Sequence, residues 1–227
     1  MDKRHSYSQE YLVDRYDRKR FCGKSGEFVN QKELSIISYF IEHTFAKNLT
    51  ILDSPCGTGR VSQFLKLNGA NVIGLDYSEP MLKKSLTNTG IPLIRSDMFH
   101  IPIKDVSIDC IVSLRFIFHY SNVEPVFHEA KRILRNGGVI IFDTFNWSPK
   151  ANFLFKDQRV FIHSRSKVRH IMKNTGMHVV GEVHCFLVSP MLYKLLPLCI
   201  VKSLNFLEKI APPWLFVRSF WCVRKSS

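Results

Sequence analysis

Two acidic residues stand at the ends of two apolar runs, with a glycine-containing turn between them. Asp53 follows Ile51-Leu52 and precedes Ser-Pro-Cys-Gly-Thr-Gly-Arg, in which glycines occupy positions 57 and 59. This order predicts a strand, a tight turn and a helix, and the glycines would let backbone N–H groups approach a ligand closely. Asp76 ends the next apolar run, at a spacing that suits hydrogen bonding to both hydroxyls of a ribose. Taken alone, the glycines also fit a plain turn and Asp76 a helix cap.

The elements that would position these residues alternate along the chain. Apolar runs near 49–53, 71–75, 91–95, 108–113 and 138–143 predict strands, and helical patterns near 59–68, 79–88 and 122–134 separate them. This alternation predicts a doubly wound α/β fold, a parallel sheet with helices on both faces. Ligands of such sheets bind outside the carboxyl ends of the strands. The polar residues expected at those ends are Asp53, Asp76, Asp97 and Ser113.

Four segments together resemble the class I S-adenosylmethionine-dependent methyltransferases, in particular the small-molecule branch that includes the ubiquinone- and menaquinone-biosynthesis enzymes. The segments are Asp53–Arg60, Asp76–Met81, Ser96–Met98 and Asn136–Phe142, and Pro55 stands where glycine is more usual. The resemblance implies a seven-stranded, mostly parallel Rossmann-like sheet with an antiparallel edge strand. It also implies S-adenosylmethionine as cofactor, S-adenosylhomocysteine as its product, and no metal.

The resemblance further implies cofactor contacts, residue by residue. Asp76 would hold the ribose, Tyr77 and Met81 would flank the adenine, and Asp97 would accept a hydrogen bond from the adenine amino group. Residues after the fourth strand would lie beside the methionine moiety. The implied cofactor-binding set is Asp53, Pro55, Gly57, Gly59, Arg60, Asp76, Tyr77, Met81, Ser96, Asp97, Met98, Leu114, Arg115 and Arg20.

His119 and Tyr16 are the candidates for contact with the reacting groups. His119 follows the fourth strand and could take a proton from a substrate hydroxyl or amine, because histidine titrates near neutrality. A structural role beside the following helix is the alternative. Tyr16 and Arg20 belong to a segment similar to the lid of related methyltransferases, where both could reach the methionine end of the cofactor, Arg20 by pairing with its carboxylate. A basic amphipathic helix without ligand contact explains that segment equally well.

The net charge of +13 is unevenly distributed along the 227 residues. Residues 33–149 hold 11 basic and 11 acidic side chains, whereas residues 150–227 hold 13 basic and 3 acidic ones. Such a field suits an anionic substrate, an anionic lipid surface or nucleic acid, and a solvated basic surface is the alternative. No apolar leader opens the sequence and no Cys-x-x-Cys pair occurs, so we expect a cytoplasmic protein with reduced thiols.

An apolar insertion, residues 189–214, separates two predicted strands at 177–188 and 219–224, which would pair antiparallel at the sheet edge. Prolines and lysines interrupt it, so it lacks the roughly 20 apolar residues of a membrane span and predicts two short amphipathic helices. These helices could wall an apolar substrate pocket, lie at a membrane interface, or cap the sheet.

The expected division of the chain is a lid segment at 1–30 and a methyltransferase domain at 31–227, whose cofactor core covers 49–143. Within the domain, further helices are expected at about 31–45 and at 164–175, the second capped by Ser164.

These features and the resemblance predict an enzyme, EC 2.1.1.-, that transfers a methyl group from S-adenosylmethionine to a small or lipid-like acceptor. The basic C-terminal region extends this hypothesis to an acceptor that is anionic or lies near a membrane. In-line alignment is the main requirement of this reaction, so neither a covalent nucleophile nor a metal is needed. A dehydrogenase is disfavoured, because Ser62 replaces the third glycine of the dinucleotide fingerprint and no Tyr-x-x-x-Lys pair occurs. The remaining alternatives are a nucleic-acid methyltransferase, disfavoured by the lack of an Asn-Pro-Pro-Tyr or Asp-Pro-Pro-Tyr motif, and a non-catalytic cofactor-binding module.

Overall fold

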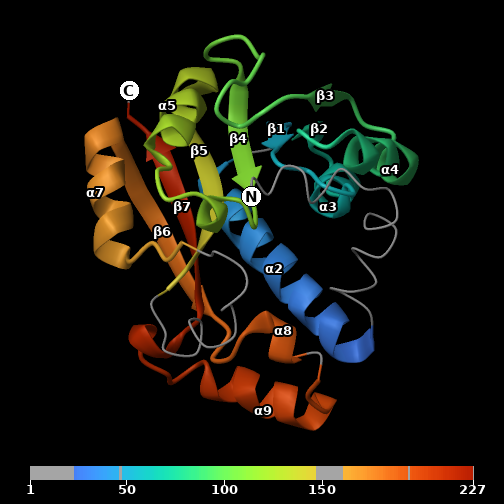
Figure 1. Cartoon of the computed structure of the whole chain (residues 1–227), viewed down its shortest axis with the longest axis vertical. Coiled ribbons are helices and arrows are strands. Elements are labelled where there is room, and N and C mark those ends of the chain that lie inside the picture. The colour runs from blue at the N-terminus through green and yellow to red at the C-terminus, as the bar shows by residue number, and fades with distance from the viewer. Residues whose placement is uncertain (1–22, 46–47, 147–160, 194, 227) are drawn as a thin grey trace.

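The computed structural model describes residues 23–45, 48–146, 161–193 and 195–226 (Figure 1). They form a seven-stranded sheet in the order β3-β2-β1-β4-β5-β7-β6. The strands are β1 (Thr50–Asp53), β2 (Asn71–Asp76), β3 (Leu93–Arg95), β4 (Ile108–Ser113), β5 (Leu134–Phe145), β6 (Met177–Cys185) and β7 (Arg218–Lys225). The helices are α2 (Gly23–Thr44), α3 (Arg60–Leu67), α4 (Glu79–Thr89), α5 (Glu124–Ile133), α7 (Arg165–Thr175), α8 (Pro190–Tyr193) and α9 (Leu198–Leu207). The predicted Rossmann-like α/β fold is confirmed.

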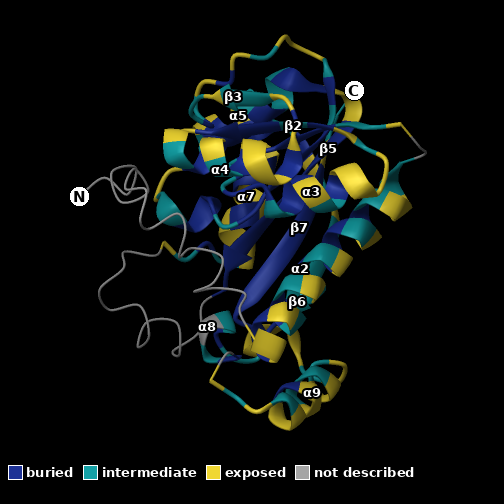
Figure 2. Ribbon diagram, turned by 90° about the vertical axis from the view of Figure 1, so that its right-hand side faces the viewer, coloured by how far each residue is buried: buried dark blue, intermediate teal, exposed yellow. Residues whose placement is uncertain are grey.

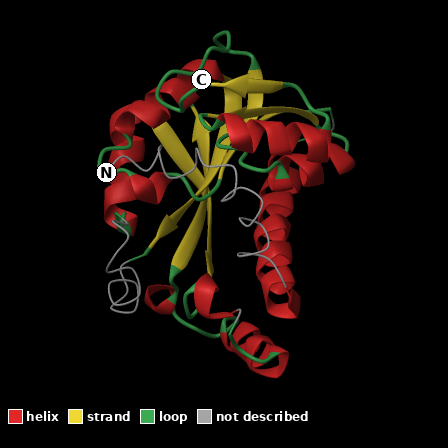
Figure 3. Ribbon diagram, turned by 45° about the vertical axis from the view of Figure 1, so that its right-hand side comes forward, coloured by secondary structure: helices red, strands yellow, loops and turns green. Residues whose placement is uncertain are grey.

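Helices cover both faces of the sheet, as Figure 3 shows. One core packs apolar side chains of α5 and α7 against the sheet, and the other packs those of α2 and α3 against the opposite face. The central strands are therefore apolar on both sides, as Ile140, Ile141 and Phe142 of β5 illustrate, all fully buried. Strand β1 lies between β2 and β4, so the strand order reverses there. Ligands of open α/β sheets bind at such a reversal.

Strand β7 is the antiparallel strand of the sheet, and it lies between β5 and β6. It pairs with β5 from Val139 to Phe145, and Trp221 in its middle is fully buried. The predicted antiparallel pairing of the two C-terminal strands is confirmed. The antiparallel strand stands one place inside the edge, and β6 is the edge strand.

Two elements extend beyond their predicted ranges. Helix α2 begins at Gly23, eight residues before the expected start at 31. Its first turns bury small residues rather than large apolar ones, so the apolar pattern of the sequence does not reveal them. Ser25 and Gly26 pack there, and the Ser25 hydroxyl donates to the carbonyl of Leu196 at 3.1 Å. Strand β5 begins at Leu134, and its pairing with β4 shifts register before Val139, so the expected turn at Asn136 is an irregularity inside the strand.

The insertion at 189–214 folds as the short helices α8 and α9 followed by a 3-10 turn, η3 (Pro213–Leu215). This agrees with the two predicted short helices. Over the described ranges, every helix is too short or too polar to cross a lipid bilayer.

Candidate cofactor-binding site

A pocket opens at the carboxyl ends of β1, β2 and β4, where the strand order reverses. Its position is the one that the alternation of strands and helices predicts. The described residues that line it are Asp53, Pro55, Cys56, Gly57, Thr58, Arg60, Val61, Leu75, Asp76, Tyr77, Ser78, Met81, Ser96, Asp97, Met98, Leu114, Arg115, Phe116, His119 and Tyr120. The structure thus brings together twelve of the fourteen predicted cofactor residues, together with the catalytic candidate His119.

The turn after β1 is fixed to both neighbouring strands by backbone hydrogen bonds. The Ser54 N–H donates to the Val112 carbonyl at 2.9 Å, and the Cys56 N–H donates to the Leu75 carbonyl at 2.8 Å. Gly57 follows with a φ of 55°, and a Cβ at this position would meet no atom within 4 Å. The backbone at Gly57 is therefore exposed to the pocket, which is what close approach of a ligand requires.

Gly59 lies outside the pocket lining and has a packing role. Its φ is 86°, and a Cβ there would lie 2.6 Å from Thr89 Cγ2 and 2.7 Å from Ser85 Oγ, both on α4. Gly59 therefore lets the start of α3 approach α4 closely. The sequence predicts that both glycines allow close approach of a ligand. In the structure Gly57 lines the pocket, whereas Gly59 allows close packing of two helices.

Two buried carboxylates stand at the strand ends. Asp76 accepts the N–H groups of Gly57 and Ser78, each at 2.8 Å, and burial raises the pKa of its carboxyl. Ser78, not Asp76, caps α4, since its side chain accepts the Met81 N–H at 3.4 Å. Asp53 accepts the Ser62 hydroxyl at 2.6 Å, and burial raises its pKa to about 7. A ligand that supplies a positive charge or hydroxyl donors would therefore stabilise the ionised form of both carboxylates.

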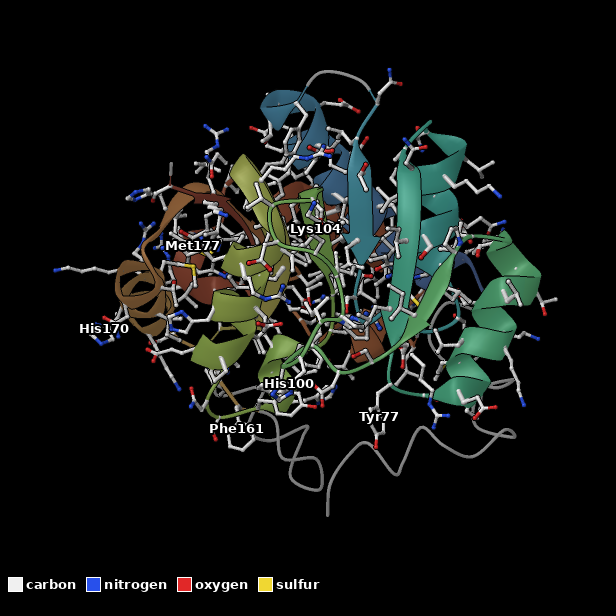
Figure 4. All side chains as sticks on the ribbon, turned by 90° about the horizontal axis from the view of Figure 1, so that it is seen from above. Tyr77, His100, Lys104, Phe161, His170 and Met177 are labelled. Carbon is white, nitrogen blue, oxygen red and sulfur yellow. The ribbon has the colours of Figure 1, made fainter. Side chains whose placement is uncertain are left out.

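The turn after β3 forms a further wall of the pocket. Asp97 accepts the Phe99 N–H at 2.8 Å, and Ser96 donates its hydroxyl to the His100 carbonyl at 2.7 Å. Met98 is buried, with its sulfur 2.7 Å from the Ser54 hydroxyl. Tyr77 is half exposed and projects outward from the ribbon (Figure 4).

Two predicted cofactor residues, Arg60 and Arg115, pair with a buried glutamate on α2. Glu33 lies 2.8 Å from Arg60 Nη2, 2.5 Å from Arg115 Nη2 and 2.5 Å from Arg218 Nη1. Burial by itself raises the pKa of Glu33, but the guanidinium groups outweigh it and hold the pKa below its ordinary value. Asp143 completes this group by pairing with Arg218 at 2.6 Å. Within these five side chains, three positive charges face two negative ones.

The far side of the pocket is aromatic. The rings of Phe116 and Tyr120 have centroids 4.9 Å apart, and Phe99 packs edge-on to Tyr120 at 5.0 Å. His119 ends the 3-10 turn η2 (Ile117–His119) between them and contacts the ring of Phe118 at 4.6 Å. A planar or apolar group fits such a wall.

Several site residues were absent from the sequence-based set. The pocket-lining residues missed are Cys56, Thr58, Val61, Leu75, Ser78, Phe116 and Tyr120. The run Phe-Ile-Phe-His-Tyr after β4 is a signal that would have indicated the two aromatic ones. Glu33 was also missed, although an acid four residues before Ile37, on the apolar face of a helix, is itself a signal.

The lid candidates Tyr16 and Arg20 lie outside the described residues, and their roles stay predictions. Among residues 23–45, 48–146, 161–193 and 195–226, no group of three or more His, Cys, Asp or Glu side chains is placed to hold a metal ion.

Comparison with known proteins places residues 52–142 in a family described as "Methyltransferase domain". Malonyl-[acyl-carrier protein] O-methyltransferase of Hamiltonella defensa is 38% identical over 99 residues, which cover 43% of this chain and 38% of that protein. Ubiquinone biosynthesis O-methyltransferase of Hydrogenovibrio crunogenus is 27% identical over 143 residues, 58% of each protein.

Among solved structures, magnesium protoporphyrin IX methyltransferase from Synechocystis PCC 6803 with bound S-adenosylhomocysteine has a similar fold. The two chains align over 98% of each, with a TM-score of 0.72 and 15% identity. The chain spans 38% and 58% of the lengths of the two relatives above. The family match, residues 52–142, contains all the pocket-lining residues named above. Residues 52–142 of this chain thus match the methyltransferase-domain family, and the seven-stranded sheet that contains them has the Rossmann-like methyltransferase fold.

Proposed function

We propose that this protein transfers a methyl group from S-adenosylmethionine to a small-molecule acceptor of lipid-like or other apolar character. The observation that carries the proposal is the pair of buried carboxylates, Asp53 and Asp76, on either side of the exposed Gly57 backbone in a methyltransferase domain. An adenosine with a methionine ammonium supplies the hydroxyl donors and the positive charge that these carboxylates favour.

In this assignment the cofactor extends from the β3 side of the pocket to the β4 side. Asp76 would accept hydrogen bonds from the ribose, with Asp97, Tyr77 and Met81 around the adenine. Arg115 follows β4, and the group that it forms with Arg60, Arg218, Glu33 and Asp143 has an excess of positive charge, which suits the methionine carboxylate on that side of the pocket.

S-adenosylmethionine supplies an electrophilic methyl group and leaves as S-adenosylhomocysteine. The acceptor lone pair forms the new bond to the methyl carbon as the carbon–sulfur bond breaks, and the sulfur keeps that electron pair. The chain's contribution is to hold the two reactants in line and to exclude water. When the acceptor is a hydroxyl, His119 at the pocket wall is positioned to take its proton.

Two features support an oxygen acceptor on an apolar molecule. Phe116 and Tyr120 give the acceptor side an aromatic wall, and His119 stands between them in the chain. Both relatives named above are O-methyltransferases by name, which agrees with a base at this wall.

Calorimetry of the purified chain with S-adenosylmethionine tests the cofactor assignment. We expect Asp76→Ala to weaken binding by roughly 100-fold, since charge-assisted hydrogen bonds contribute about 1.5–3 kcal/mol each. The variant also loses the acceptor for the Gly57 and Ser78 N–H groups, so unfolding is measured in parallel. Asp105→Ala, at an exposed carboxylate away from the pocket, is the control. Near-wild-type affinity of Asp76→Ala would contradict the ribose assignment.

Turnover assays on extracted lipid, glycan and RNA fractions test the reaction itself. Methyl incorporation into the lipid or another small-molecule fraction supports the proposal, and incorporation into RNA alone would replace it with a nucleic-acid methyltransferase. Cofactor binding without product in any fraction would replace it with a non-catalytic module.

A further inference from the structure

The insertion between β6 and β7 exposes a cluster of large apolar side chains. Of the fourteen exposed large hydrophobic residues in the described ranges, seven lie between positions 195 and 215, so they are concentrated rather than scattered. They are Leu195, Ile200, Phe206, Leu207, Ile210, Trp214 and Leu215, and we call them the apolar end surface. The exposed fractions are 78% at Leu195, 75% at Ile210 and 73% at Trp214.

Helix α9 is the centre of this surface, and it is an apolar helix with an exposed body. Its sequence is Leu-Cys-Ile-Val-Lys-Ser-Leu-Asn-Phe-Leu, yet Val201 is its one fully buried residue. Figure 2 shows α9 as a mostly exposed helix at one end of the molecule. A surface helix of a globular protein normally turns its apolar side toward the core, so this arrangement calls for a partner.

Polar contacts attach the insertion to the domain, together with the buried side chains of Tyr193 and Val201, while the exposed apolar residues take no part. Glu208 accepts the Tyr193 hydroxyl at 2.8 Å and the Phe186 N–H at 3.1 Å, and it pairs with Lys32 on α2. Lys32 also donates to Asn205 of α9 at 2.6 Å. The insertion is thus held in one orientation while its apolar end surface stays outside.

The exposed charges of the described part of the insertion have one sign. Lys202 and Lys209 are exposed, whereas Glu208, the acidic residue of the insertion, has a side chain that is 6% exposed and is engaged by Lys32. Aromatic and aliphatic side chains next to lysines match an interface in which acyl chains lie beneath anionic headgroups. A second protein copy would instead have to oppose these lysines with acidic groups.

The apolar end surface lies at the same end of the sheet as the pocket. Arg218, which begins β7 directly after the insertion, pairs with Phe145 at the carboxyl end of β5. Asp143 of β5 accepts the N–H of Arg115, a pocket residue after β4. In Figure 1, β4 points toward the end of the molecule that carries α8 and α9. The insertion that carries the apolar end surface therefore projects from the end of the sheet at which the pocket lies.

We propose that the apolar end surface, with Lys202 and Lys209, docks the protein on an anionic lipid bilayer. Leu195, Ile210 and Trp214 would enter the headgroup–acyl boundary, and the lysines would remain at the level of the lipid phosphates. Docking is a property of the insertion and does not depend on methyl transfer.

Sedimentation of the full chain with vesicles, in the absence of S-adenosylmethionine, tests the proposal. The vesicles are phosphatidylcholine alone or phosphatidylcholine mixed with phosphatidylserine, at low salt. We expect binding to the mixed vesicles, weakened about fivefold for each lysine removed by Lys202→Ala and Lys209→Ala. The triple variant Phe206→Ser, Ile210→Ser, Trp214→Ser is expected to bind at least about tenfold more weakly.

Matched controls carry the same changes elsewhere on the surface. Lys104→Ala with Lys173→Ala removes equal charge, and Leu67→Ser with Leu86→Ser removes exposed apolar side chains of α3 and α4. Both controls are expected to bind as the wild type does. All changed side chains are exposed, so circular dichroism and thermal unfolding should match the wild type. Insertion should also shift the Trp214 emission to shorter wavelength, a shift that Trp214→Phe abolishes.

Three results would overturn the proposal. Equal sedimentation with neutral and anionic vesicles would show that the lysines contribute no electrostatic attraction to the membrane. An equal loss of binding in the Lys104→Ala, Lys173→Ala control would show that only the net charge of the protein matters, not the position of Lys202 and Lys209. Failure to bind vesicles, together with a concentration-dependent dimer that the triple variant abolishes, would assign the surface to a second copy of this chain. Each of these results leaves the methyl-transfer assay unaffected, so the two proposals fail separately.

Discussion

Asp53 combines burial with a position in the pocket wall, and this makes its charge sensitive to ligands. Its carboxylate has a hydrogen-bond donor in Ser62, but burial still raises the pKa to about 7. Because the folded-state pKa lies above the ordinary 3.8, the stability contributed by this group is present at acid pH and is lost as the pH rises through 7. A bound ammonium reverses that preference, since it favours the ionised form.

This predicts that affinity for S-adenosylmethionine rises with pH between about 5.5 and 7.5, by up to tenfold per pH unit below the pKa. Calorimetry across this range measures the slope. In Asp53→Asn the part of the slope due to this group should disappear, because the amide does not titrate. An unchanged slope in the variant would contradict contact between Asp53 and the ammonium.

The packing of α3 against α4 depends on a single missing side chain. Gly59 combines a left-handed backbone with contact distances to Ser85 and Thr89 that leave no room for a Cβ. Gly69, at the end of α3, has a similar φ of 83°, but nothing lies within 4 Å of its Cβ position. A comparison of alanine substitutions at Gly59 and Gly69 therefore distinguishes the effect of steric crowding from that of backbone strain.

We expect Gly59→Ala to destabilise the fold by about 2–5 kcal/mol, adding overpacking to backbone strain, and Gly69→Ala by about 1–2 kcal/mol from strain alone. Urea unfolding of the two variants measures the difference. Gly57→Ala should resemble Gly69→Ala in stability but lose cofactor affinity, because its Cβ would enter the pocket. Equal stability losses at 59 and 69 would argue against crowding by α4.

Sequence reasoning locates elements whose signal is local. Strand-tip acids such as Asp53 and Asp76 stand out because each follows an apolar run, and Ser164 was recognised as the cap of α7, which its bond to the Lys167 N–H confirms. The first turns of α2 were missed because Ser25 and Gly26 are buried through close approach to the insertion, and small residues give no apolar period. Contacts distant in sequence set that boundary.

At the scale of the whole molecule, Glu33 joins four parts of the chain. It belongs to α2, and its partners Arg60, Arg115 and Arg218 belong to α3, the turn after β4 and β7. None of these pairings has a local sequence signal, because the partners are 27 to 185 residues away. The site's charge therefore could not be predicted from the pocket motifs alone.

Glu33→Gln should destabilise the protein by about 3–5 kcal/mol at neutral pH, because it removes a buried carboxylate that pairs with three guanidinium groups, although Arg218 keeps Asp143 as a second partner. Since the folded-state pKa of Glu33 lies below its ordinary value, this stability is present above about pH 4.5 and is lost as the pH falls. Thermal unfolding at pH 7 and near pH 3 measures it. The wild type should lose more stability on acidification than the variant, and parallel losses would contradict the assignment.

The position of β7 between β5 and β6 has a consequence for how the chain is made. Translation produces β6 first and then the whole insertion, and only afterwards does β7 emerge to join β6 to the sheet. Until then β6 has no strand to pair with, and the ion pair between Glu33 and Arg218 cannot form. A nascent chain paused within the insertion therefore presents a five-stranded sheet whose β5 edge is unpaired, the stage at which a chaperone would be most needed.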